Sequence, residues 1–203
     1  VMEGAVEARN DLGAVQLAKG EGCTVAKGAA PIKQILLNPE NSVQWAIYYP
    51  PVLGLEAFSG LLQGATDSEK LGWDALRKGD YGVAESEFVG PDWRDIVGKA
   101  LALNAQGNTA EAAELLDSYK GNGSGEYLLL RAGFLLSTGG VEEASNLLAR
   151  AETVGSNGNE LAKNDFLSAV NAQRAIISLA QNRREEATKY AARGISLSNM
   201  SES

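Results

Sequence analysis

The sequence contains no histidine and only one cysteine, Cys23. Histidine is the commonest general base near neutral pH and the commonest metal ligand, so its absence removes most catalytic and metal-binding arrangements. A single cysteine cannot form a disulfide within the chain, and it indicates no redox compartment. We therefore expect that the protein is not an enzyme and that it binds no cofactor and no metal.

Long apolar runs and clusters of basic residues are also missing. No stretch approaches the roughly 18 consecutive apolar residues of a membrane-spanning helix. The 18 lysines and arginines are scattered and are outnumbered by 26 aspartates and glutamates, which gives a formal net charge of −8. Nucleic acids and anionic membranes attract clustered positive charge, so neither is expected as a partner. Because the sequence begins within a predicted strand, we expect a fragment whose targeting segment lies upstream.

The sequence is rich enough in hydrophobic residues, at 44%, to form a packed core, and it carries a pattern that occurs four times. Each copy has a central Gly or Asn, a small residue seven positions before it, an alanine five positions after it and an apolar residue nine positions after it. The copies are Gly72/Gly79/Ala84/Phe88, Ala100/Gly107/Ala112/Leu116, Ala132/Gly139/Ala144/Leu148 and Ala175/Asn182/Ala187/Ala191.

This pattern predicts a pair of helices around each central residue. Gly, and after it Asn, adopts most readily the left-handed backbone conformation that ends a helix. The small residues on either side allow the two helices to approach closely, and the last position lies one turn further along the same face. We therefore expect about four divergent helix pairs over residues 65–203.

The order of small residue, Gly and Ala resembles the tetratricopeptide repeat, whose period is about 34 residues. Here the alanines are 28 (84 to 112), 32 (112 to 144) and 43 (144 to 187) residues apart. The short first gap predicts a short second helix that ends at Gly90-Pro91. The long last gap predicts an insertion at residues 155–159 and a helix from about 161 to 180. The resemblance implies a mostly α fold with an α-α superhelix, and an ordinary helical bundle is the alternative.

Residues 1–35 predict a small antiparallel β module instead. Strands are expected near residues 1–8, 14–17 and 23–26, with turns at 10–13 and 20–22. This segment resembles the C-terminal part of a FecR-type domain, an all-β module of bacterial envelope proteins, in the stretches 3–7 (EGAVE), 17–22 (LAKGEG) and 28–31 (GAAP) and in Val25. Any meander of β-hairpins is the plainer alternative.

Residues 36–64 are expected to connect the two parts. Asn38-Pro39-Glu40 is typical of a helix start, and Pro50-Pro51 is typical of a helix end. Between them lie Trp45, Tyr48 and Tyr49. We interpret these rings as an anchor that packs the β module against the helices, because large rings usually stabilise by burial. A recognition patch is the alternative.

A stack of helix pairs presents its first helices on a concave face. The residues two, three, six and ten positions before each central Gly or Asn are expected on that face, and most of them are apolar. As partner-binding residues we predict Trp73, Leu76, Val97, Leu101, Asn104, Leu129, Leu136, Ile176 and Leu179. Tetratricopeptide proteins that hold a C-terminal carboxylate use Lys and Asn on this face, and that clamp is not expected here.

An apolar groove has two possible occupants. A partner protein can place an amphipathic helix or an extended peptide in it, or the chain can fill it with its own connector, from Trp45 to Phe58. The resemblances imply a non-enzymatic protein–protein interaction scaffold in the periplasm or cell envelope of a bacterium. The alternatives are a FecR-type signalling regulator linked to outer-membrane uptake, or a carbohydrate or cell-wall binding module with Trp45, Trp73 or Trp93 as stacking platforms.

Overall fold

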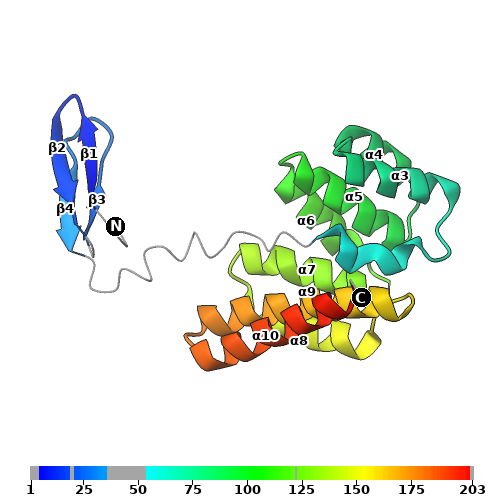
Figure 1. Ribbon diagram of the computed structural model, residues 1–203. Coiled ribbons are helices and arrows are strands. Elements are labelled where there is room, and N and C mark those ends of the chain that lie inside the picture. Colours follow the sequence, from blue (N-terminus) through cyan, green and yellow to red (C-terminus); the bar gives the residue numbers. More distant parts are fainter. Residues whose placement is uncertain (1–4, 19–20, 36–53, 122, 202–203) are drawn as a thin grey trace. The chain divides into compact units, whose positions relative to one another are not determined.

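The computed structural model describes residues 5–18, 21–35, 54–121 and 123–201. The chain folds as two compact units, Val1–Tyr49 and Pro50–Ser203 (Figure 1). The predicted aromatic helix of the connector lies outside the described residues. Among the described residues, none of the helices combines the length and the apolar character that a membrane span needs.

The first unit consists of two antiparallel hairpins. Strand β1 (Val6–Asn10) pairs with β2 (Gly13–Leu17), and β3 (Glu21–Thr24) pairs with β4 (Ile32–Ile35). The predicted turn at residues 10–13 is confirmed, and the Asn10 side chain stabilises it by accepting a hydrogen bond from the backbone N–H of Leu12 (3.0 Å). The fourth strand was not predicted, because Ile32–Ile35 has no regular alternation of apolar and polar residues.

The β unit buries few apolar side chains among its described residues. Leu17 is buried, whereas Val6, Leu12, Val25 and Ile32 are all at least half exposed. Short strands gain most of their stability from side chains that pack on a sheet face. Within the described residues, backbone ladders therefore hold each hairpin, and the Asn10 side chain joins the two by donating a hydrogen bond to the carbonyl of Ala29 (2.7 Å).

The second unit is helical throughout its described residues, so the predicted mostly α class with an N-terminal antiparallel β module is confirmed. It begins with the 3₁₀ helix η1 and continues with four helix pairs, α3/α4, α5/α6, α7/α8 and α9/α10. The bounds are η1 Leu55–Leu62, α3 Asp67–Lys78, α4 Tyr81–Glu87, α5 Trp93–Ala105, α6 Thr109–Ser118, α7 Gly125–Ser137, α8 Val141–Val154, α9 Glu160–Ala180 and α10 Arg184–Ser201.

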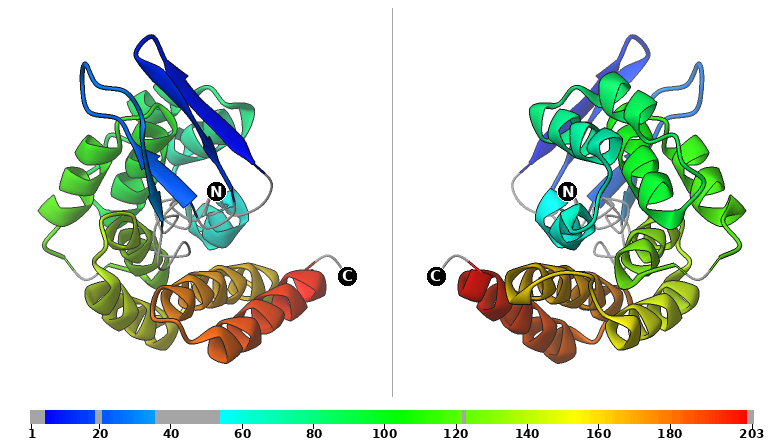
Figure 2. Two further views of the ribbon diagram at one scale, coloured as in Figure 1. Left: turned by 90° about the vertical axis from the view of Figure 1, so that its left-hand side faces the viewer. Right: turned by 90° about the vertical axis from the view of Figure 1, so that its right-hand side faces the viewer.

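The helix pairs follow one another along an arc, with η1 on its inner side (Figure 2). The first helices α3, α5, α7 and α9 each contact the next one in this order. Helix α4 has only seven residues and α9 has 21, as the short first gap and the long last gap of the pattern predicted. Between α8 and α9 lies the predicted insertion, residues 155–159.

Every central residue of the pattern has the predicted left-handed backbone. The φ angles are 82° at Gly79, 88° at Gly107, 85° at Gly139 and 57° at Asn182. In each copy the residue that follows donates its backbone N–H to the carbonyl five positions earlier, at 2.7–2.9 Å. These bonds join Asp80 to Ala75, Asn108 to Leu103, Gly140 to Leu135 and Arg183 to Ser178. Such a bond satisfies a carbonyl at the helix end and sets the direction in which the next helix leaves.

The small residues of the pattern lie at the helix crossings. Ala84, Ala112 and Ala144 have no exposed surface and Ala187 has almost none. At Gly72 a Cβ atom would lie 2.7 Å from the ring of Phe88, so this position has room for Gly alone. Ala191, the last residue of the fourth copy, is exposed because none of the described helices follows α10 to cover it.

A further repeated feature joins each helix pair to the preceding one. Lys99, Arg131 and Arg174 all lie eight positions before the central Gly or Asn, and each pairs with a carboxylate on the preceding helix. The pairs are Lys99–Glu85 (4.0 Å), Arg131–Asp117 (3.0 Å) and Arg174–Glu152 (2.7 Å). We call these three pairs the ionic ladder.

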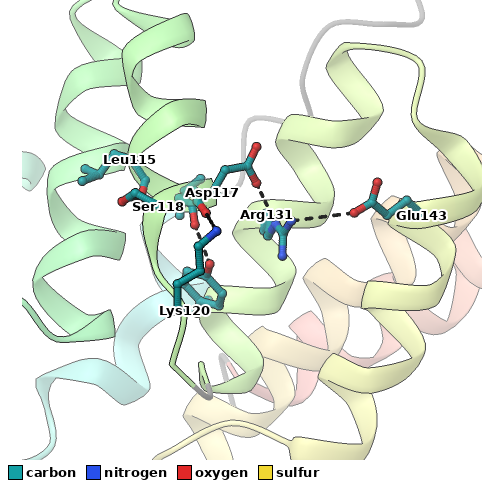
Figure 3. A network of polar contacts seen from close by, with 8 residues as sticks. Leu115, Asp117, Ser118, Lys120, Arg131 and Glu143 are labelled. Atoms are coloured by element: carbon teal, nitrogen blue, oxygen red, sulfur yellow. Dashed lines mark hydrogen bonds and ion pairs between the residues drawn. The ribbon is translucent and has the colours of Figure 1, made fainter.

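In the middle pair, Arg131 on α7 also reaches Glu143 on α8 at 3.7 Å, so one guanidinium connects three helices (Figure 3). The first copy has Leu71 at the same position, with 59% of its surface exposed. Helix α3 has no preceding helix pair among the described residues, and its residue at this position accordingly carries no charge. The ionic ladder therefore follows the junctions between helix pairs.

The left-handed turns predict opposite effects for the same substitution at two glycines. Gly107→Ala should lower the free energy of unfolding by about 1–2 kcal/mol, because a Cβ atom is strained at positive φ. Gly82→Ala, inside α4 with no atom within 4 Å of the added Cβ, should raise it by about 0.5–1 kcal/mol. Urea denaturation followed by circular dichroism measures both. Equal effects at the two sites would contradict the assigned role of Gly107.

The ionic ladder predicts a larger effect at a half-buried pair than at an exposed one. Arg174 and Glu152 keep only 20% and 32% of their side-chain surface exposed, against 64% and 53% for Lys78 and Asp74. Arg174→Met should lower the free energy of unfolding by about 1–2 kcal/mol, because Glu152 loses a charged hydrogen-bond partner. Lys78→Met should leave it almost unchanged, because an exposed ion pair is screened by water and contributes little. Urea denaturation in low and high salt tests both, and a salt-independent result at Arg174 would contradict the ionic explanation.

Candidate interaction surface

Three aromatic rings, from η1, from α3 and from the residue that follows α4, form a continuous row inside the helical unit. Phe58 of η1 stacks on Trp73 of α3, with ring centroids 6.4 Å apart, and Trp73 meets the ring of Phe88 edge-on at 5.6 Å. Phe58 has no exposed surface, and the other two rings are 2% exposed. Aromatic rings packed in this way dominate local core energetics. The row therefore fixes η1 against the first helix pair.

The segment η1 also contacts the last helix pair. Ala57, Phe58 and Leu61 are buried, and η1 packs against α3 and α9. At Gly60 a Cβ atom would lie 1.6 Å from the backbone oxygen of Asn157, so η1 touches the inserted loop backbone to backbone. Residues 54–64, which were predicted as part of a connector, thus belong to the helical unit, because their apolar side chains complete its core.

A buried carboxylate holds the inserted loop against α7. Glu126, which has no exposed surface, accepts hydrogen bonds through Oε1 from the hydroxyl of Ser156 (2.8 Å) and the backbone N–H of Asn157 (2.9 Å). Its position in the first turn of α7 places the carboxylate at the positive end of the helix dipole. The loop is therefore held between α7 on one side and Gly60 of η1 on the other.

Most of the predicted concave face is interior. Among the nine predicted partner-binding residues, the five with at most 5% exposure are Trp73, Leu76, Val97, Leu129 and Leu136. The expectation that these five side chains lie open on a groove therefore needs correction. They pack in the core because η1 and the neighbouring helices cover them.

Four of the predicted residues keep access to the surface. Leu101 and Asn104 on α5 and Ile176 on α9 are half-buried, and Leu179 on α9 is 47% exposed. Leu101 also packs against the core. We call these four side chains the residual face. Helix α7 contacts both α5 and α9, so it lies between the two helices that carry the residual face.

The position of Phe58 answers part of the question of what fills the predicted groove, a partner or the chain itself. This residue lies at the end of the segment predicted to fold back, and it does fill the space beside Trp73. Trp45, Tyr48 and Tyr49, the predicted anchor, lie outside the described residues. Of the tryptophans proposed as stacking platforms for carbohydrate, Trp73 is buried. Trp93 is half-buried, and the guanidinium of Arg94 lies 4.9 Å from its ring centroid.

One group of carboxylates in the described part of the chain is close enough to hold a cation. Oxygen atoms of Glu69, Asp92 and Asp95 lie within 4.8 Å of one another. The first two have a structural task, however. Glu69 completes the capping box of α3 with Thr66, and Asp92 caps α5 by accepting from the backbone N–H of Arg94 (2.8 Å). The group is therefore explained by helix caps at the junction of two helix pairs.

Asp95 is the member of this group whose protonation depends on the fold. Burial raises the pKa of Asp95, and the negative charges of Asp92 and Glu69 raise it further, while a hydrogen bond from the backbone N–H of Gly90 opposes the shift. A buried carboxyl group with a raised pKa favours its neutral form. The folded protein therefore binds the Asp95 proton more tightly than the unfolded chain does.

This shift predicts a pH-dependent effect of Asp95→Asn. Because the pKa is raised in the fold, ionised Asp95 destabilises the protein, and that loss grows as pH rises from the ordinary aspartate range through the folded pKa. The variant, which cannot ionise, should become more stable relative to the original protein as pH rises above the ordinary aspartate pKa, about 4. Urea denaturation at several pH values measures the difference. A gap that stays constant with pH would contradict the raised pKa.

Comparison of the chain with protein-family models, curated proteins and solved structures finds no match. We therefore interpret the surface from its own residues. It contains apolar side chains and one asparagine, and among the described residues it brings together no nucleophile and base. Such a surface can bind through contact and burial.

Proposed function

We propose that the protein is a non-enzymatic protein–protein interaction scaffold whose helical unit is a tetratricopeptide-like superhelix. The observation that carries this proposal is the repeated junction: the same left-handed turn, the same backbone hydrogen bond and the same small residues recur in four helix pairs. Stacked helix pairs that contact mainly their neighbours form extended surfaces suited to binding another chain. The ionic ladder supports the proposal, because its cation recurs at one position of the repeat.

The residual face is the surface that we assign to the partner. Leu101, Ile176 and Leu179 offer apolar contact, and Asn104 can donate and accept hydrogen bonds. A partner protein or peptide with an amphipathic segment fits this chemistry, because its apolar side chains would be removed from water while the asparagine directs its backbone. No nucleic acid is expected, since the net charge of the chain is −8.

The location that we propose is the periplasm or cell envelope of a bacterium. Its support is the resemblance of residues 1–35 to a FecR-type domain. The two antiparallel hairpins of this segment are compatible with a small all-β module. The scaffold function is preferred over a carbohydrate-binding module because Trp73 is buried in the aromatic row.

Substitutions on the residual face test the proposal. The double variant Ile176→Glu and Leu179→Glu should weaken partner binding at least about tenfold, because an apolar interface would then contain unpaired carboxylates. Ala192→Glu, at an exposed position of α10, is the matched control. Leu136 is unsuitable for such a test, since it lies in the core.

The measurement is affinity capture from a bacterial envelope extract, quantified by mass spectrometry, with circular dichroism to show that each variant folds. Proteins retained by the original chain and by the Ala192→Glu variant but lost from the double variant are the expected result. If the double variant folds and retains the same set of proteins, the residual face is not the binding surface.

A further inference from the structure

The segment η1 has the side-chain pattern of a ligand that binds in a groove. Its apolar residues Leu55, Phe58, Leu61 and Leu62 recur at intervals of three and four positions, and Phe58 and Leu61 have no exposed surface. Glu56 in this segment and Gln63, the residue that follows it, are exposed. Amphipathic peptides that dock into helical grooves show this spacing of anchors. The inner side of the helix pairs thus already holds a peptide of this chemistry.

The contacts between η1 and the helices are apolar, and the backbone of Gly60 also lies against the carbonyl oxygen of Asn157 in the inserted loop. Among the described residues, no hydrogen bond and no ion pair joins Leu55–Leu62 to helices α3–α10, and its own backbone bonds stay within residues 54–65. A 3₁₀ helix is also less stable than an α-helix of the same length. The segment can therefore leave without breaking polar interactions with the helices.

The chain has a natural pivot between η1 and α3. Gly64 has φ 80°, lies exposed and has no atom within 4 Å of the point that a Cβ would occupy. Helix α3 begins independently of η1, because its capping box is formed by Thr66 and Glu69 alone. Rotation at Gly64 would move η1 while α3 stays capped.

We propose that η1 is an exchangeable occupant of the inner face, and that an amphipathic peptide of a partner protein replaces it. The peptide would carry an aromatic residue with leucines three positions to either side, and its ring would take the place of Phe58 on Trp73. This inference rests on the proposed scaffold function and deepens it. Docked η1 keeps the inner face closed, and exchange extends the residual face to Trp73.

To replace η1, the partner peptide must compete with η1 for the same site. A segment tethered to its own site has an effective concentration in the millimolar range, about 1 mM for a short flexible tether. A free peptide of equal intrinsic affinity therefore binds the original protein weakly. Removing the Phe58 ring weakens the tethered competitor and leaves Trp73 in place, so the free peptide gains access.

The test uses the full chain and a fluorescent peptide with the sequence of residues 54–64 (GLEAFSGLLQG). Fluorescence anisotropy should show that the Phe58→Ala protein binds this peptide at least about tenfold more tightly than the original protein does. The same peptide with alanine in place of its phenylalanine should bind neither protein. Glu56→Gln, at an exposed position of η1, should behave like the original protein. If Phe58→Ala folds and binds the peptide no better than the original protein, the inference is overturned.

Hydrogen exchange on the original protein tests whether η1 opens locally, even if the Phe58→Ala variant fails to fold. The amides of η1 should exchange at least about tenfold faster than those of α5 and α7, because they open locally rather than with the whole unit. Equal protection of η1 and α7 would show that η1 is a permanent part of the core and would overturn the inference.

The two proposals fail in distinguishable ways. In one outcome, the Phe58→Ala protein binds the peptide, and the Ile176→Glu and Leu179→Glu variant captures the same proteins as the original chain. That outcome would support the replacement of η1 by a peptide and refute the residual face as the binding surface. In the other outcome, the Ile176→Glu and Leu179→Glu variant loses captured proteins, and the amides of η1 and α7 show equal hydrogen exchange. That outcome would support the residual face as the binding surface and refute the replacement of η1 by a peptide.

Discussion

Each helix pair depends on one residue that holds the left-handed backbone conformation. At Gly79, Gly107, Gly139 and Asn182 this conformation ends the first helix and turns the chain back. The following backbone N–H bonds a carbonyl five residues earlier, so the turn has the same geometry each time. Because the direction of the second helix follows from that geometry, the small residues reach the crossing in every copy, and the pairs can stack.

Stacking is then directed by charge and by shape. The ionic ladder places one cation of each later pair against a carboxylate of the preceding helix, where partial burial strengthens the interaction. Gly72 and Gly98 provide the space that the ring of Phe88 requires between the first two pairs. The interior is completed by η1, which touches both α3 and α9. A segment outside the repeats thus connects the first helix pair with the last.

This arrangement explains why the expected open groove is largely closed. Predicted binding residues such as Trp73 and Val97 lie on the inner side of the first helices, and their apolar character made them candidates for a partner site. Within the chain, η1 and the neighbouring helices remove these side chains from water. Apolar residues on a concave face are equally suited to a partner and to the chain itself. The residual face consists of the four predicted residues that keep access to the surface.

The sequence by itself determined the local features: the left-handed turns, the short α4, the insertion at residues 155–159 and the length of α9. These depend on backbone preferences and on spacing within one helix pair, which a sequence displays directly. Only the tertiary structure decided the ionic ladder and the position of η1. The ladder's acids stand 6 (Glu85), 10 (Asp117) and 13 (Glu152) residues after the preceding turn, so no single spacing reveals them. The burial of Phe58 depends on α3 and α9, which are about ninety residues apart and meet only in the folded chain.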